Sequence, residues 1–329
     1  MDDIDFLLVN ALQVYPRVSW AQLETVIGVD ATVLSRRWSR LRQEGIAWSA
    51  CFSISSASPQ QSTMAVAFVE VDCVAGERER VIERVSRNRD VLTIECTSGS
   101  RELFLTLGIS NVGEVDRYVS GELSSIPGVL ATRTHFSRRF FKDGSAWRLH
   151  VLREWQLRQL RELRSASGDV PPAPTPVHLR VIEALAGDIR RPATAVAAEI
   201  GRSVSTTNRA IAQVMQAPWA RTRVDFAHNL AGFYSIAVLW LQVPHPELEH
   251  VGAALAVMPE TRMCVSVVGR ANLLVSLWLR KLSDYDEIEN KLARNFPSTQ
   301  VDDRWIVPRV AKRLGHVLRA DGASSHFVG

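Results

Sequence analysis

The sequence predicts an α+β protein made of two copies of one unit. Each copy is expected to contain a three-helix, winged or helix-turn-helix module followed by a ferredoxin-like module of order βαββαβ. Two observations predict this arrangement. Residues 5–45 align without a gap with residues 178–218 at a constant offset of 173, and Gly99 corresponds to Gly269 at an offset of 170. A repeat of this length indicates that the chain contains two similar units.

Composition narrows the class of protein. The 329 residues include 39 basic and 35 acidic side chains, a net charge of +4, and 46% are hydrophobic, which excludes global disorder. No apolar run approaches the roughly 20 residues of a membrane-spanning helix, and the acidic start of the chain argues against a secretory signal. The four cysteines lie far apart, as is typical of reduced thiols. We therefore expect a cytoplasmic protein that does not contact a membrane.

The first helical module is assigned to residues 1–52. Hydrophobic residues from Ile4 to Leu12 recur at helical spacing, and Ser19 with Gln22 forms a capping box for a second helix. Gly28 makes the turn, and Asp30 is a suitable N-cap for a third helix over residues 31–43. Three short helices with this turn describe a helix-turn-helix.

The third helix has the two faces that a DNA-reading helix needs. Leu34, Trp38 and Leu41 share its apolar face. We expect its other face to contact DNA through Thr32, Ser35, Arg36, Arg37 and Arg40. A solvated arginine face on an ordinary helical domain is the alternative interpretation.

The second helical module, residues 175–226, keeps the pattern with different chemistry. Its third helix is expected over residues 203–215, with Ser205, Thr206, Asn208, Arg209 and Gln213 facing outward. Asparagine and glutamine read adenine edges, and arginine reads guanine or phosphate. Arg221 and Arg223 follow, either as phosphate contacts or as part of a solvated loop.

The ferredoxin-like modules are assigned to residues 63–142 and 233–320. Residues 147–174 between the copies predict an amphipathic helix and a proline-rich linker. Apolar residues alternate along residues 103–107 and 273–277, so one face of each sheet needs a partner. The two sheets are expected to pair within the chain or with another chain, giving a homodimer or a higher homo-oligomer. The tail after Ala320 is expected to fray.

This order of modules resembles the Lrp/AsnC, or feast/famine, family of transcription regulators. Residues 3–12 resemble the opening helix of that family, and residues 34–46, which follow Gly28-Val29, are similar to its recognition helix. The resemblance implies binding of double-stranded DNA through Arg36, Arg37 and Arg40. It also implies ferredoxin-like modules of the RAM type, which oligomerise and bind an amino-acid-like effector.

The central hairpins depart from the family pattern. A Gly-x-aromatic-Asp signature is replaced by Gly-Ser-Arg-Glu from Gly99 and by Gly-Arg-Ala-Asn from Gly269. An effector is expected near these turns, at Ser98, Gly99, Ser100, Arg101, Gly269, Arg270 and Asn272. Glycines that serve only the backbone geometry of a turn are the alternative interpretation.

The sequence favours a binding protein over an enzyme. It contains no phosphate-binding glycine loop, no nucleophile elbow and no histidine spacing typical of a metal site, so we expect no catalytic residue, metal or cofactor. The predicted function is sequence-specific regulation of transcription. Two alternatives remain: a nucleoid-type architectural DNA binder, and an enzyme similar to the sirohaem decarboxylases, which share this architecture. His135, on a predicted strand, suggests the latter.

Overall fold

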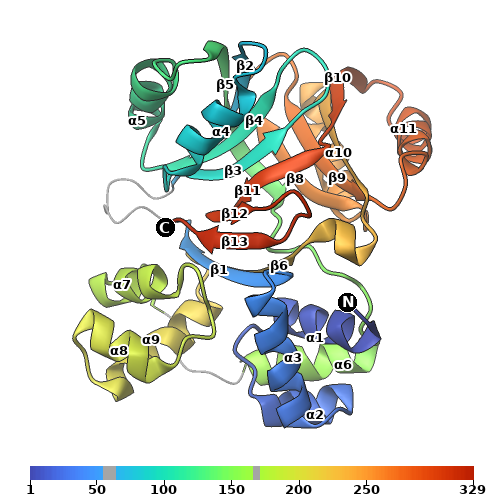
Figure 1. Cartoon of the computed structure of the whole chain (residues 1–329). Coiled ribbons are helices and arrows are strands. Elements are labelled where there is room, and N and C mark those ends of the chain that lie inside the picture. Colours follow the sequence, from blue (N-terminus) through green and yellow to red (C-terminus); the bar gives the residue numbers. More distant parts are fainter. Residues whose placement is uncertain (55–63, 166–170) are drawn as a thin grey trace.

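The computed structural model describes residues 1–54, 64–165 and 171–329. The α+β fold predicted from the sequence is confirmed. Two groups of helices lie on one side of the molecule, and a large sheet flanked by further helices lies on the other (Figure 1). Within the described ranges, no helix combines the length and apolarity needed to cross a bilayer.

The first helical module begins and ends where its capping residues predict. Its helices are α1 (Asp3–Val14), α2 (Trp20–Ile27) and α3 (Ala31–Gln43). Ser19 and Gln22 form the predicted capping box, Asp30 accepts from the backbone of Thr32 and Val33, and Gly28 ends α2 at a φ of +78°. Helix α6 (Glu154–Ser165) packs back onto α1 and α2. The helix after the first copy therefore completes the first helical module.

The second helical module has the same order of helices. They are α7 (Pro176–Leu185), α8 (Ala193–Ile200) and α9 (Val204–Gln216). Ser203 caps α9 by accepting from the Thr206 amide, and Gly201 ends α8 in the left-handed conformation, as Gly28 ends α2.

An antiparallel strand pair joins the two helical modules. Strand β1 (Ala47–Ser53) pairs with β6 (Ala220–Phe226), and the pairing is centred on Ala50 and Arg223. These two residues are equivalent at the offset of 173, so equivalent strands meet about a local two-fold axis. Such self-complementary pairing is the geometry of a homodimer, here within one chain.

Both ferredoxin-like modules show the predicted βαββαβ order. The first consists of β2 (Ala65–Cys73), α4 (Arg78–Ser86), β3 (Val91–Cys96), β4 (Leu103–Ile109), α5 (Val112–Arg117) with a π-helical turn (Tyr118–Leu123), and β5 (Val129–Lys142). The second consists of β7 (Ser235–Gln242), α10 (Leu248–Ala256), β8 (Thr261–Val267), β9 (Leu273–Leu279), α11 (Asp284–Asn295) and β10 (Gln300–Ile306). Short 3-10 helices precede β7 (His228–Ala231) and α10 (His245–Glu247).

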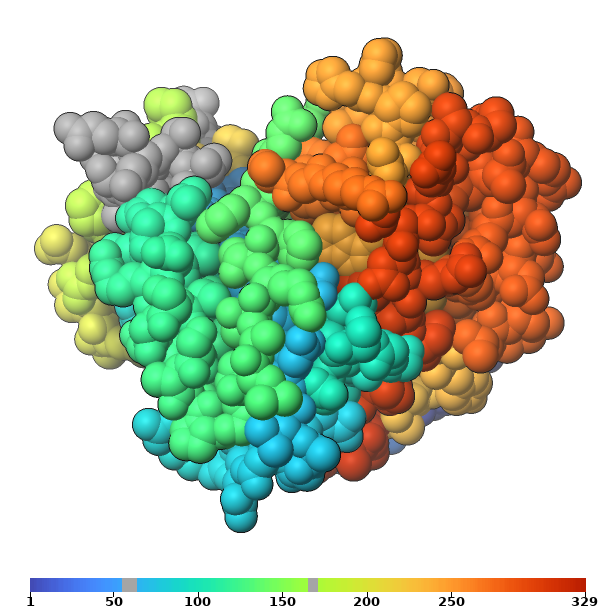
Figure 2. All heavy atoms as spheres, turned by 90° about the horizontal axis from the view of Figure 1, so that it is seen from above, coloured from blue at the N-terminus to red at the C-terminus, as the bar shows by residue number. Residues whose placement is uncertain are grey.

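The two modules exchange strands and lie side by side (Figure 2). The first half of β5 pairs with β2 and its second half with β8, whereas β10 pairs with β7 and the next strand, β11 (Arg309–Arg313), pairs with β3. Lys142 opposes Cys264 and Lys312 opposes Ile94, which are equivalent pairs at the offset of 170. The expected pairing of the sheets therefore occurs within the chain. Aromatic residues of both copies share the core between them, including Phe104 and Trp240.

The end of the chain corrects one expectation. Residues after Ala320 do not fray but form β13 (Ser324–Phe327), which pairs with β12 (His316–Leu318). The Ser324 amide donates to the Gly45 carbonyl at 2.7 Å, directly before β1. The tail is ordered because its backbone hydrogen bonds are satisfied by β12 and, at Ser324, by Gly45 of the first copy.

Candidate functional site

The outward face of α3 has fewer arginine side chains without an ion-pair partner than its sequence suggests. Leu34, Trp38 and Leu41 are buried as predicted, Thr32 and Arg36 are exposed, and Ser35 is half-buried. Arg36 has no ion pair with any residue in the described parts of the chain.

Arg37 and Arg40 are engaged by helix α1 instead. Arg37 donates to Asp2 at 2.7 Å and to Asp5 at 3.0 Å, and Arg40 donates to Asp5 at 2.7 Å. The hydrogen bonds to Asp2 and Asp5 raise the pKa of Arg37. Asp5 is only 1% exposed, so these arginines compensate a buried carboxylate. The side chain of Arg37 is 26% exposed, and its guanidinium fastens α3 to α1.

Helix α9 presents a free polar face. Ser205, Thr206, Asn208 and Arg209 are all exposed, and Arg209 has no ion pair among the described residues. Gln213 differs, since its side-chain oxygen lies 2.9 Å from Nε2 of the buried His178. The side chains of these four residues, at the start of α9, are therefore accessible to a partner molecule.

Arg221 and Arg223 do not lie in a solvated loop. Both belong to β6, on the side of the strand that faces the large sheet. Arg223 pairs with Asp225 at 2.7 Å, and Arg221 lies 3.4 Å from Asp143. Strand pairing with β1 turns these side chains inward, which the local sequence does not reveal.

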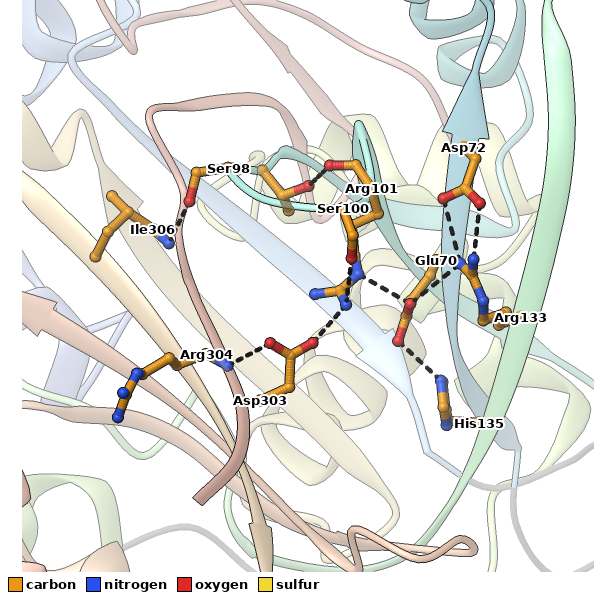
Figure 3. Close-up of polar contacts among 11 residues, drawn as sticks. Glu70, Asp72, Ser98, Ser100, Arg101, Arg133, His135, Asp303, Arg304 and Ile306 are labelled. Carbon is orange, nitrogen blue, oxygen red and sulfur yellow. Dashed lines mark hydrogen bonds and ion pairs between the residues drawn. The ribbon is translucent and has the colours of Figure 1, made fainter.

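The first hairpin turn is bonded to the other copy (Figure 3). Arg101, whose side chain is 7% exposed, pairs with Glu70 at 2.9 Å and with Asp303, and stacks over Trp305 at 4.2 Å. The amide of Ser98 donates to the Ile306 carbonyl at 2.9 Å, and the Ser98 hydroxyl accepts from the Ile306 amide at 3.0 Å. This turn therefore joins β10 to the first copy. Gly99 adopts a φ of +94°, and Ser100 is exposed.

Glu70 is the centre of this polar network. It accepts from Arg133, and one of its oxygens lies 3.1 Å from Nε2 of His135 (Figure 3). Burial by itself raises the pKa of Glu70, but the hydrogen bond with His135 and the charge of Arg101 outweigh it, so the pKa lies below its usual value. His135 also stacks on Trp240 at 4.6 Å. The histidine that suggests an enzyme is thus held by neighbouring side chains on both sides.

The second hairpin turn is bonded in the same way. The Val268 amide donates to Phe136 at 3.0 Å, which is the equivalent of the bond between Ser98 and Ile306. Asn272 exchanges two hydrogen bonds with the backbone of Val243, at 2.8 and 2.9 Å. Arg270 is 79% exposed beside Asp302, and Gly269 lies in the turn itself. Among the described residues, no cluster of histidine, cysteine and carboxylate side chains has the arrangement of a metal site.

Comparisons with known proteins agree with this architecture. Residues 66–147 match the Lrp/AsnC ligand binding domain. An HTH-type transcriptional regulator of Pyrococcus horikoshii is 23% identical over 146 residues, which are 44% of this chain and 91% of the relative. One from Pyrococcus abyssi is 28% identical over 138 residues, which are 42% of this chain and 92% of the relative. Each relative thus corresponds to less than half of this chain.

One solved structure is similar along almost the whole chain. The siroheme decarboxylase NirDL is 15% identical, covers 95% of this chain and 93% of its own, and superposes with a TM-score of 0.59. At this identity the likeness concerns the fold alone. Fold and matches together define a tandem protein with two helix-turn-helix and two ferredoxin-like modules. The resemblance to the Lrp/AsnC family is confirmed by the match at residues 66–147, and the structure repeats the same order of elements in the second half of the chain.

Proposed function

We propose that this protein is a sequence-specific regulator of transcription that inserts α3 and α9 into the major groove of double-stranded DNA. The observation that carries the proposal is the unpaired polar surface on both helices, formed by Arg36 with Thr32 on α3 and by Asn208 with Arg209 on α9. Helix-turn-helix proteins read DNA with such side chains on an anchored second helix.

The two-fold strand pair supports two reading heads in one chain. Homodimers place two recognition helices about a two-fold axis and bind two half-sites. Here the β1–β6 pair relates the two helical modules in that way. Because α3 offers Ser35 and Arg36 whereas α9 offers Ser205, Thr206 and Asn208, the two half-sites differ in sequence and the operator is not a palindrome.

A small-molecule effector, a cytoplasmic location and further self-association belong to the same proposal. The match to a ligand binding domain supports the effector. Exposed apolar side chains on the ferredoxin-like modules, including Leu130 and Val268, support a dimer of the whole chain. Light scattering that finds only monomer would contradict the dimer.

The test combines selection of genomic fragments by the purified protein with gel-shift assays on those fragments. Arg36→Ala and Arg209→Ala are each expected to weaken binding at least about fivefold, since an arginine–guanine contact contributes about 1–3 kcal/mol. Arg270→Ala is the matched control, because it removes the same charge from an exposed site on a ferredoxin-like module. Unchanged retention by both helix variants would contradict the proposed surface.

The alternative functions predict different results. An architectural DNA binder would protect DNA uniformly, without discrete footprints, and its affinity would fall steeply with salt. The whole-chain likeness to a decarboxylase is the observation that favours an enzyme. A purified protein with a haem-like absorption band and no DNA retention would favour that alternative.

A further inference from the structure

A large cavity lies between the strand pair of the helical modules and the sheet of the ferredoxin-like modules. Its volume is about 710 Å³. Phe52 of β1 and Arg221 and Arg223 of β6 form one side of it, and residues of both copies, such as Phe104 and Trp278, form the other. Cavities of this size accommodate small organic ligands.

The cavity has an excess of positive charge. Five arginines line it: Arg138, Arg221, Arg223, Arg262 and Arg313. Glu95 and Asp143 line the cavity as well. The buried Asp225, which is not part of the lining, forms ion pairs with Arg223 and Arg262. Arginine keeps its proton in proteins, so three carboxylates leave two of the five positive charges uncompensated.

Two of these cations are buried with unpaired donors. Arg262 is 4% exposed and Arg313 is 3% exposed. Nε and Nη1 of Arg262 and Nη1 of Arg313 have no hydrogen-bond partner in the described parts of the chain. Burial, followed by the charge of Arg223, lowers the pKa of Arg262. Buried cations with free donors are costly, and an anion that accepts from them removes that cost.

Four of the five arginines, all except Arg138, belong to the second copy. At the offsets of 173 and 170, the equivalents of Arg221, Arg223, Arg262 and Arg313 are Trp48, Ala50, Leu92 and Asp143. The first copy therefore has apolar or acidic residues where the second has arginine. A purely structural role in two equivalent units would not require this difference.

The remaining lining is apolar and aromatic. The guanidinium groups of Arg262 and Arg313 lie 4.1 and 4.9 Å from the ring centre of Trp278. Phe104 and Phe136 line the same space. We infer that this cavity binds an amphipathic organic anion, with its acidic group at Arg262 and Arg313 and its apolar body against Trp278 and the phenylalanines.

The position of the cavity gives the anion a way to influence the helical modules. Arg221 and Arg223 belong to β6, whose pairing with β1 sets how the two modules are related. Asp225 of the same strand is held by Arg262 of the sheet at 2.9 Å. An anion that draws Arg262 and Arg223 toward itself competes with Asp225 and shifts β6. This regulatory part of the inference rests on the proposed function.

The binding experiment uses two dyes that differ in one charge. The probe is 8-anilinonaphthalene-1-sulfonate, and the control is N-phenyl-1-naphthylamine, which has the same aromatic body without the sulfonate. The full chain is expected to bind the sulfonate dye at one site, with energy transfer from tryptophan, and the neutral dye at least about tenfold more weakly, as for a lost charge-assisted hydrogen bond. Equal affinity for both dyes would overturn the inference.

Variants assign the binding to the cavity. Arg313→Gln is expected to weaken sulfonate binding at least about tenfold, whereas Arg294→Gln, an equal change of charge at an exposed site on α11, leaves it unchanged. Arg138→Gln, at an exposed cavity residue, provides the same test if Arg313→Gln does not fold. Glu95→Gln removes a negative charge from the cavity and is expected to tighten binding of the sulfonate dye but not of the neutral dye, whereas loss of structure would increase the binding of both. If the affinity for the sulfonate dye is the same in all these variants as in the wild type, the assignment of the binding site to this cavity is wrong.

A DNA measurement separates this inference from the proposed function. Saturating dye is expected to change the affinity for selected genomic fragments in the wild type and not in Arg313→Gln. Dye binding with the predicted variant pattern supports the anion site even if the protein retains no DNA. In that case the regulatory part fails together with the proposed function, and the site stands.

Discussion

At the residue scale, buried cations connect the two copies. The chain has four lysines, and Lys142 and Lys312 occupy equivalent positions in the crossing strands. Lys142 donates to the Met258 carbonyl at 3.3 Å, and Lys312 donates to the Asn88 carbonyl at 2.7 Å. Met258 and Asn88 are themselves equivalent at the offset of 170. Sequence reasoning missed this pair of ties, although the shared offset of two rare lysines was available as a signal.

His316 provides a prediction about pH. Burial lowers its pKa from 6.5 to about 4, and its ring lies between Trp48 and Phe327. Between pH 6.5 and pH 4 the unfolded chain binds a proton that the folded chain does not, so stability falls as the pH falls through this window. Relative to His316→Gln, the wild type is expected to lose about 2 kcal/mol of unfolding free energy from pH 7 to pH 5.

Urea unfolding at the two pH values, followed by tryptophan fluorescence, measures this difference. His150, which is exposed, supplies the control variant His150→Gln. If the stability difference between the wild type and His316→Gln is the same at both pH values, the pKa of His316 is not lowered in the folded protein and the prediction is wrong.

At the element scale, the junction of α3 and β1 depends on one glycine. Gly45 has a φ of +72°, and a Cβ built on it would lie 2.0 Å from the carbonyl oxygen of Ser324 in β13. Gly28 has a similar φ of +78° with no atom within 4 Å of its Cβ position. The two glycines therefore separate backbone strain from collision with the C-terminal strand.

Gly45→Ala is expected to destabilise the protein by at least about 2 kcal/mol and to release β13, because strain and collision add. Gly28→Ala carries only the strain of a left-handed residue, about 1 kcal/mol. Urea unfolding measures the stabilities, and limited proteolysis detects release of the tail in Gly45→Ala alone. Equal behaviour of the two variants would mean that the tail does not hold the α3–β1 junction.

At the scale of the whole molecule, duplication replaces a homodimer by one asymmetric chain. The equivalent strands β1 and β6 pair with each other, and the β5–β8 pairing is repeated in equivalent positions by the β11–β3 pairing, as in a dimer of identical subunits. Side chains have diverged around this frame, on α3 and α9 and around the cavity between the strand pair and the large sheet. The two copies in one chain can acquire different residues at equivalent positions, whereas identical subunits cannot.

Footprinting on a selected fragment tests this asymmetry. Arg36→Ala is expected to remove protection from one half of the site, and Asn208→Ala from the other half, because each residue belongs to a different reading helix. Loss of the same protected bases in both variants would show that only one helical module reads DNA.

The sequence by itself determined the units and the elements. The constant offsets revealed the duplication, and the caps at Ser19 and Asp30 placed helix starts correctly, because periodicity and capping depend on neighbours in the chain. Only the tertiary structure decided what the charged side chains do. Arg37 is bound to Asp5, Arg101 to Asp303, and Arg223 is turned toward a cavity. These roles depend on contacts between strands and helices that are far apart in the sequence. Local sequence patterns do not predict such contacts.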